Sequence, residues 1–110
     1  MTVSDLIKTM NLEVLTGDDF DREVKGGYCC DLLSWVMGRA QADDAWITVM
    51  GNVNSVAVAV LADTACIILA DSSALDDDAK KRAEMQGVVI LRSEKNNFDL
   101  CVELGKLLRK

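Results

Sequence analysis

The chain has 110 residues, a size typical of one domain, and 50% of them are apolar, which is enough for a hydrophobic core. Its formal net charge is −6 and it has no histidine, so it lacks the clustered Lys and Arg that nucleic acids and anionic membranes require. The longest apolar run, Val56–Ala70, is too short to span a bilayer, and no leader pattern is present. We expect a single domain over residues 1–110, cytoplasmic, with no nucleic acid and no membrane as partners.

The first predicted elements are a helix and a strand. An apolar stripe at helical spacing follows Thr2, which stands at the capping position: Val3, Leu6, Ile7 and Met10. The short apolar run Leu12–Leu15, closed by Thr16-Gly17, predicts a strand and then a solvated loop.

The next stretch, Asp21–Met37, holds a charged start, a glycine pair and two adjacent cysteines. Gly26-Gly27 indicates a tight turn or a close approach of two backbones. We expect Asp31 to cap a helix that ends near Gly38. Its apolar face is expected to contain Leu32, Leu33, Val36 and Met37, broadened by Trp35.

From Ala45 onward one pattern occurs three times: an apolar run with β-branched residues, a polar turn and a helical stripe. The runs are Ala45–Val49, Ala65–Leu69 and Val88–Leu91. Three consecutive βα units imply parallel strands, and continuous apolar runs imply strands covered on both faces. The predicted fold class is α/β, a three-layer α/β/α sandwich with a mostly parallel sheet.

Each of these three helices has an expected inward face. The first follows Gly51-Asn52 and is expected to bury Val53, Val56, Ala57, Val60 and Leu61. The second starts at Asp76-Asp77-Asp78, places Ala79 and Ala83 inward and ends at Gly87. The stripe of the third is Phe98, Cys101, Val102, Gly105 and Leu108.

The sequence disfavours catalysis. Neither glycine-rich phosphate-binding pattern occurs, and a serine nucleophile would lack a histidine base. Consecutive acids such as Asp76-Asp77-Asp78 point in different directions on a helix, so they suit its N-terminus better than a cation. We expect no enzymatic activity, no cofactor and no metal.

Small ligands of parallel sheets bind beyond the carboxyl ends of the strands. The residues at the predicted ends include five candidates for a ligand-binding pocket: Asn52, Asn54, Asp71, Ser72 and Ser93. Asn, Asp and Ser are equally the ordinary residues of turns and caps, and that alternative stays open.

Four cysteines are present without a C-x-x-C pair: Cys29, Cys30, Cys66 and Cys101. Free buried thiols are one interpretation. Adjacent side chains of an extended segment point to opposite faces, so at most one of Cys29 and Cys30 is expected to be buried, and the other is a candidate redox sensor.

A surplus of apolar side chains favours self-association, most simply as a two-fold dimer. The candidate interface residues are Tyr28, Trp35 and Met37.

The stretch from Asp21 resembles the signature of the DRTGG domain family. The matching residues are Asp21, Arg22, Gly26, Gly27, Tyr28 and Asp31 with the Leu-Leu-Ser that follows it. The resemblance extends to Ala45–Thr48, to Asn54 with its Val-Ala-Val-Ala run, and to Ala65–Leu69, and so covers nearly the whole chain. Here Glu23–Lys25 separate the Asp-Arg and Gly-Gly pairs, and the threonine is absent.

The resemblance implies a fold similar to the N-terminal domain of HPr kinase/phosphorylase and to the first domain of Mur ligases. It implies no kinase activity, because that chemistry lies in a separate P-loop domain. Family members occur in phosphotransacetylases and beside CBS-domain pairs in regulated pyrophosphatases, which implies a role in regulation or subunit contact. Small standalone members accompany redox and hydrogenase-associated proteins, which are therefore the expected protein partners.

The leading hypothesis is a non-catalytic regulatory or scaffolding domain that acts as a cytoplasmic homodimer. The alternative is a small-ligand sensor, with adenine nucleotides as the first ligands to test and a pocket at the carboxyl ends of the strands.

Overall fold

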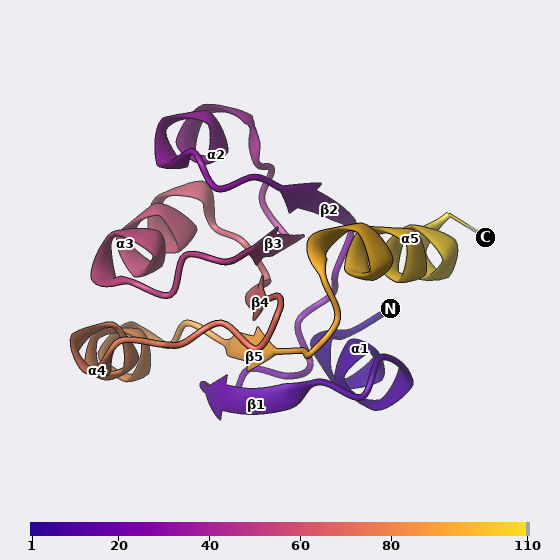
Figure 1. Cartoon of the computed structure of the whole chain (residues 1–110), viewed down its shortest axis with the longest axis horizontal. Coiled ribbons are helices and arrows are strands. Elements are labelled where there is room, and N and C mark those ends of the chain that lie inside the picture. Colours follow the sequence, from indigo (N-terminus) through magenta and orange to yellow (C-terminus); the bar gives the residue numbers. More distant parts are fainter. Residues whose placement is uncertain (110) are drawn as a thin grey trace.

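Four consecutive strands of the chain run parallel in a five-stranded sheet, and helices cover both of its faces (Figure 1). The computed structural model describes residues 1–109. Its strands are β1 (Glu13–Thr16), β2 (Gly26–Cys29), β3 (Asp44–Thr48), β4 (Cys66–Leu69) and β5 (Ile90–Arg92). Its helices are α1 (Val3–Thr9), α2 (Leu33–Arg39), α3 (Val53–Ala62), α4 (Asp77–Gln86) and α5 (Asn97–Leu108). The predicted α/β/α sandwich is confirmed.

The strand order is β1-β5-β4-β3-β2. The connecting helices α2, α3 and α4 lie on one face of the sheet, and α1 and α5 lie on the other (Figure 1). β1 is antiparallel to β5 and forms one edge, while β2 forms the opposite edge. No helix in the described part of the chain is long and apolar enough to cross a membrane.

The continuous apolar runs of β3 and β4 are buried along their whole length, because side chains on both faces of these strands meet helices. Ala45, Ile47 and Ile68 pack toward α1 and α5. Trp46 points to the opposite face and is fully buried there, and its indole Nε1 donates a hydrogen bond to the Cys30 carbonyl at 3.0 Å.

Several helix ends follow local sequence rules. Thr2 and Asp5 form a reciprocal capping box on α1, and Asn52 caps α3. Gly87 adopts a left-handed conformation that ends α4, as predicted.

Asp31 does not cap α2, and that prediction was wrong. The N-cap is Leu32, which makes no side-chain hydrogen bond to the helix. The Asp31 carboxylate instead accepts hydrogen bonds from the Thr48 hydroxyl at 2.7 Å and from the Val49 N–H at 3.0 Å. A long-range pair of donors at the end of β3 therefore outcompetes the local cap.

The glycine pair lies within β2, a strand that the sequence pattern did not reveal. The turn interpretation is wrong, and the close neighbours of the two glycines are side chains, not a second backbone. A Cβ on Gly26 would lie 2.7 Å from Asp44 Oδ1, and one on Gly27 would lie 2.8 Å from Leu104 Cδ2. β2 forms because its backbone pairs with β3. The residues of β2 alone do not predict this pairing.

The expected inward faces of three helices need correction. In α2 only Val36 is fully buried, and Leu32, Trp35 and Met37 are about half exposed. The buried residues of α3 are Ser55, Val56, Val58 and Ala59, whereas Val60 and Leu61 are exposed. Those of α5 are Leu100 and Leu104, whereas Phe98 and Val102 are exposed. These helices carry more apolar residues than the sheet covers, so spacing alone does not select the face that meets the sheet.

Candidate functional site

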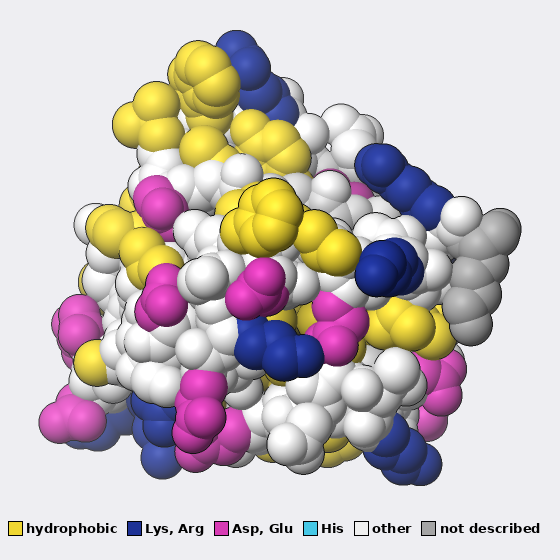
Figure 2. Space-filling view, turned by 45° about the vertical axis from the view of Figure 1, so that its right-hand side comes forward, with side chains coloured by type: hydrophobic (Ala, Val, Ile, Leu, Met, Phe, Trp, Pro, Cys, Tyr) yellow, Lys and Arg dark blue, Asp and Glu magenta, His cyan; other side chains and the backbone are white. Residues whose placement is uncertain are grey.

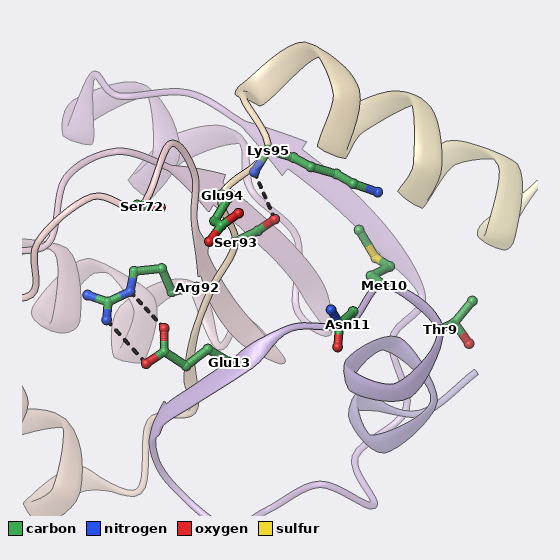
Figure 3. Close-up of a pocket in the computed structure, with 9 residues that line it drawn as sticks. All are labelled: Thr9, Met10, Asn11, Glu13, Ser72, Arg92, Ser93, Glu94 and Lys95. Atoms are coloured by element: carbon green, nitrogen blue, oxygen red, sulfur yellow. Dashed lines mark hydrogen bonds and ion pairs between the residues drawn. The ribbon is translucent and has the colours of Figure 1, made fainter.

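A polar hollow of about 690 Å³ lies where β5 ends (Figure 3). Four separate segments build it: the end of α1, the start of β1, the loop after β4 and the end of β5. The lining residues are Thr9, Met10, Asn11, Glu13, Ser72, Arg92, Ser93, Glu94 and Lys95. The hollow thus lies at the carboxyl end of a parallel strand, the position at which open α/β sheets bind small ligands.

Two cations of this hollow are held by carboxylates. Arg92 donates to both oxygens of Glu13, at 3.1 Å and 3.2 Å, and Figure 3 shows the two side chains face to face. Lys95 Nζ lies 2.9 Å from Glu103 Oε2. Ser93 Oγ accepts the Lys95 backbone N–H at 3.1 Å. Cationic and anionic side chains therefore surround the hollow. Such a lining suits a polar small molecule bound by hydrogen bonds.

The loop after β4 adopts an unusual backbone at this site. Asp71 and Ser72 have φ values of 55° and 53°, in the left-handed region that residues other than glycine rarely occupy. The loop is fixed by backbone bonds, from Asp71 N to the Lys95 carbonyl and from Ser72 N to the Ser93 carbonyl, both at 2.9 Å. Such strain is concentrated at functional sites in proteins.

The five predicted ligand-binding residues separate into two groups. Ser72 and Ser93 line the hollow, and Asp71 directly precedes Ser72. Asn52 and Asn54 lie at another strand end: the Asn52 side chain accepts the Ser55 N–H, and Asn54 is exposed on α3.

The predicted ligand-binding residues do not include Glu13, Arg92 and Lys95, which supply most of the charge of the hollow. Arg92 and Lys95 lie close to Ser93 along the chain, so the sequence alone places them at the end of the same strand. The position of Glu13 depends on the antiparallel pairing of β1 with β5, for which the residues give no signal.

The motif residue Arg22 has a structural position. Its guanidinium contacts Asp43 and Asp63, and with 24% of the side chain exposed it is largely enclosed. The hydrogen bond from Arg22 lowers the pKa of Asp43. Asp21 beside it is exposed. Arg22 thus joins the segment before β2 to the start of β3 and the end of α3.

A second surface surrounds the β2 edge. Tyr28 is partly buried against the core beneath α2 and α3, while Trp35 and Met37 of α2 are 48% and 50% exposed. The Arg39 guanidinium lies over the Trp35 ring, 3.7 Å from its centre. Figure 2 shows apolar side chains gathered at the top of the molecule, the end at which α2 and β2 lie in Figure 1.

All four cysteines are free, and only Cys66 is fully buried, so the interpretation of four buried thiols was wrong. Cys29 is exposed and Cys30 is partly buried. Burial of the sulfur raises the pKa of Cys29 to about 12, and the neighbouring Cys101 thiol contributes to this shift. A thiol with so high a pKa is a weak nucleophile at neutral pH, which argues against Cys29 as a sensor acting alone.

No family model and no curated protein matches the sequence. Among solved structures, the chain is similar to the CBS and DRTGG domains of the regulatory region of Clostridium perfringens pyrophosphatase, which was crystallised with its activator diadenosine tetraphosphate. The TM-score is 0.68 and the sequence identity is 8%. The match covers 94% of this chain, which spans 45% of that chain. At this identity the similarity shows the fold alone, and it confirms a DRTGG-like fold.

Proposed function

We propose that this chain is a non-catalytic regulatory or scaffolding domain that acts as a homodimer in the cytoplasm, with the β2 edge as the contact between copies. One observation carries the proposal: β2 is an open sheet edge flanked by two helices that expose apolar side chains. These are Leu32, Trp35 and Met37 from α2 and its start, and Phe98 and Val102 from α5. Regulation is also the role of the pyrophosphatase region with the same fold.

The two edges of the sheet differ in how well they resist pairing. β1 carries the charged Glu13 and a register shift between Val14 and Thr16, both of which discourage the addition of a strand. β2 contains no charged residue and pairs in an unbroken register with β3. An unprotected edge strand is a template for another strand, and this difference favours β2 as the edge that a second copy occupies.

A two-fold axis perpendicular to the sheet would pair two β2 strands antiparallel. The same axis brings α2 against its copy on one face and α5 against its copy on the other, so both apolar surfaces are buried together.

Light scattering of the purified chain at micromolar concentration tests the dimer. We expect twice the monomer mass for the native chain and the monomer mass for Trp35→Glu, because the introduced carboxylates would face each other across the axis. Met85→Glu is the matched control, since Met85 is 82% exposed on α4, away from β2, and should leave the dimer intact. A monomeric native chain contradicts the proposal.

A small-ligand sensor is the second candidate, and the hollow at the end of β5 favours it. Its strained loop and its polar lining are features of a binding site, and the similar pyrophosphatase region is complexed with an adenine dinucleotide. Ligand binding to the folded state raises the melting temperature, so a thermal-shift panel of adenine nucleotides, including diadenosine tetraphosphate, tests this function. A shift that Ser93→Leu abolishes supports the sensor. No shift across the panel, with an intact dimer, excludes adenine nucleotides as its ligands.

A further inference from the structure

We propose that Cys29 and Cys101 form an oxidisable dithiol, which a peroxide converts to a disulfide that joins β2 to α5. The inference goes beyond the proposed function and does not depend on the dimer. It also differs from a sensor built on the adjacent Cys29 and Cys30.

Packing between β2 and α5 brings the two thiols to one place. Gly27 and Leu104 are in close contact, since a Cβ on Gly27 would lie 2.8 Å from Leu104 Cδ2. Cys29 is two residues beyond Gly27 and therefore points to the same face of the strand. Cys101 is three residues before Leu104 and lies on the same side of the helix. The two cysteines also line one hollow of about 520 Å³.

In the single chain this hollow is open to small oxidants, and the other two thiols lie elsewhere. Cys66 is fully buried in β4. Cys30 packs against the core on the opposite face of the sheet, and its sulfur accepts the Leu32 N–H at 3.4 Å. Among the described cysteines, Cys29 and Cys101 are therefore the pair that shares an accessible space.

The oxidation balances with hydrogen peroxide as the oxidant. The Cys101 sulfur attacks one peroxide oxygen, which breaks the O–O bond, forms a sulfenic acid and releases water. The Cys29 sulfur then attacks the sulfenic sulfur, loses its proton and releases a second water. Two thiols are oxidised to one disulfide while peroxide is reduced to two waters.

Burial controls the second step. The pKa of Cys29 is raised to about 12, so its thiolate fraction is small at neutral pH and increases as the pH rises. We expect disulfide formation to become faster as the pH rises from roughly 7 to 9.

Peptide mapping by mass spectrometry under non-reducing conditions, after mild peroxide, tests the inference on the folded chain. We expect one linked pair of peptides containing Cys29 and Cys101, a mass lower by about 2 Da, and reversal by a thiol reductant. Cys29→Ser and Cys101→Ser should each abolish the linked pair. Cys30→Ser is the matched control and should retain it.

Three outcomes would overturn the inference: a Cys29–Cys30 bond, a disulfide between two chains in place of the linked pair, or oxidised Cys101 with Cys29 still free. A shift in the melting temperature gives an independent readout. The oxidised native chain should melt higher than the reduced chain, because a cross-link over most of the sequence restricts the unfolded state, and Cys101→Ser should lose this difference.

Discussion

The Arg22 guanidinium binds Asp43 through two nitrogens, with Nε at 3.0 Å and Nη2 at 2.9 Å from the same carboxylate oxygen. Nη2 also donates to the carbonyl and the carboxylate of Asp63, at 2.6 Å and 3.0 Å. Both aspartates have positive φ, 69° at Asp43 and 57° at Asp63. One side chain thus stabilises two left-handed residues, one before β3 and one at the end of α3.

We predict that Arg22→Met lowers the free energy of unfolding by about 1 kcal/mol, because it removes the donor of partly exposed charged and carbonyl acceptors. Urea unfolding monitored by tryptophan fluorescence measures the change. Arg82→Met is the matched control, since Arg82 is exposed on α4, and should change stability by less than about 0.5 kcal/mol. Equal stability of the two variants would show that the Arg22 contacts add nothing.

The same contact predicts a pH dependence. The hydrogen bond from Arg22 lowers the pKa of Asp43 below that of an unfolded aspartate, about 3.9. Its contribution to stability is therefore present above that pH and is lost as the pH falls through the folded-state pKa. Unfolding measured at about pH 6 and about pH 3 should show a smaller acid loss in Arg22→Met than in the native chain. Asp5, whose pKa is lowered by its bonds with Thr2, contributes equally to both proteins.

Asp31 and Asp21 are both motif residues, but only Asp31 should matter for stability. Asp31→Ala removes the acceptor of the buried Thr48 hydroxyl and of the Val49 N–H, at an expected cost of about 1–2 kcal/mol. Asp21 is exposed, so Asp21→Ala should cost less than about 0.5 kcal/mol. Thermal unfolding of the two variants in parallel makes the comparison, and the reverse order would contradict the structural position of Asp31.

Two glycines should respond oppositely to alanine. A Cβ on Gly51 would overlap the main-chain oxygen of Ala74, and backbone does not move as freely as a side chain. Gly51→Ala should therefore lose at least about 2 kcal/mol. A Cβ on Gly105 would meet no atom within 4 Å, so Gly105→Ala in α5 should gain about 0.5–1 kcal/mol. Chemical denaturation of both variants measures the difference, and a neutral Gly51→Ala would refute the predicted overlap.

The parts of the fold that could be predicted are specified either by residues close together in the sequence or by uninterrupted apolar runs. The capping box at Thr2 involves residues three positions apart, and the buried strands β3 and β4 contain the continuous apolar runs Ala45–Ile47 and Cys66–Leu69. β2 was missed because its strand character comes from pairing with β3. Asp31 was wrongly predicted to cap α2, because the donors that bind its carboxylate, at Thr48 and Val49, lie far from it along the chain.

The candidate site was only partly predictable for the same reason. Ser72 and Ser93 follow adjacent strands, so the rule for strand ends brings them together. The rule does not distinguish one strand end from another. It therefore also predicted Asn52 as a ligand-binding residue, whereas Asn52 caps α3. The Glu13–Arg92 pair depends on where β1 attaches to the sheet, and only the completed tertiary structure fixes that edge.

The position of β1 has a consequence for how the chain folds during synthesis. Glu13 and Arg92 are separated by 79 positions, so β1 leaves the ribosome long before β5, its neighbour in the sheet, exists. β3, β4 and β5 each pair with the strand that precedes them in the chain. The parallel half of the sheet can therefore assemble progressively, while β1 joins last, after β5 has emerged. Formation of the hollow at the end of β5 is accordingly a late event, because Glu13 arrives with β1.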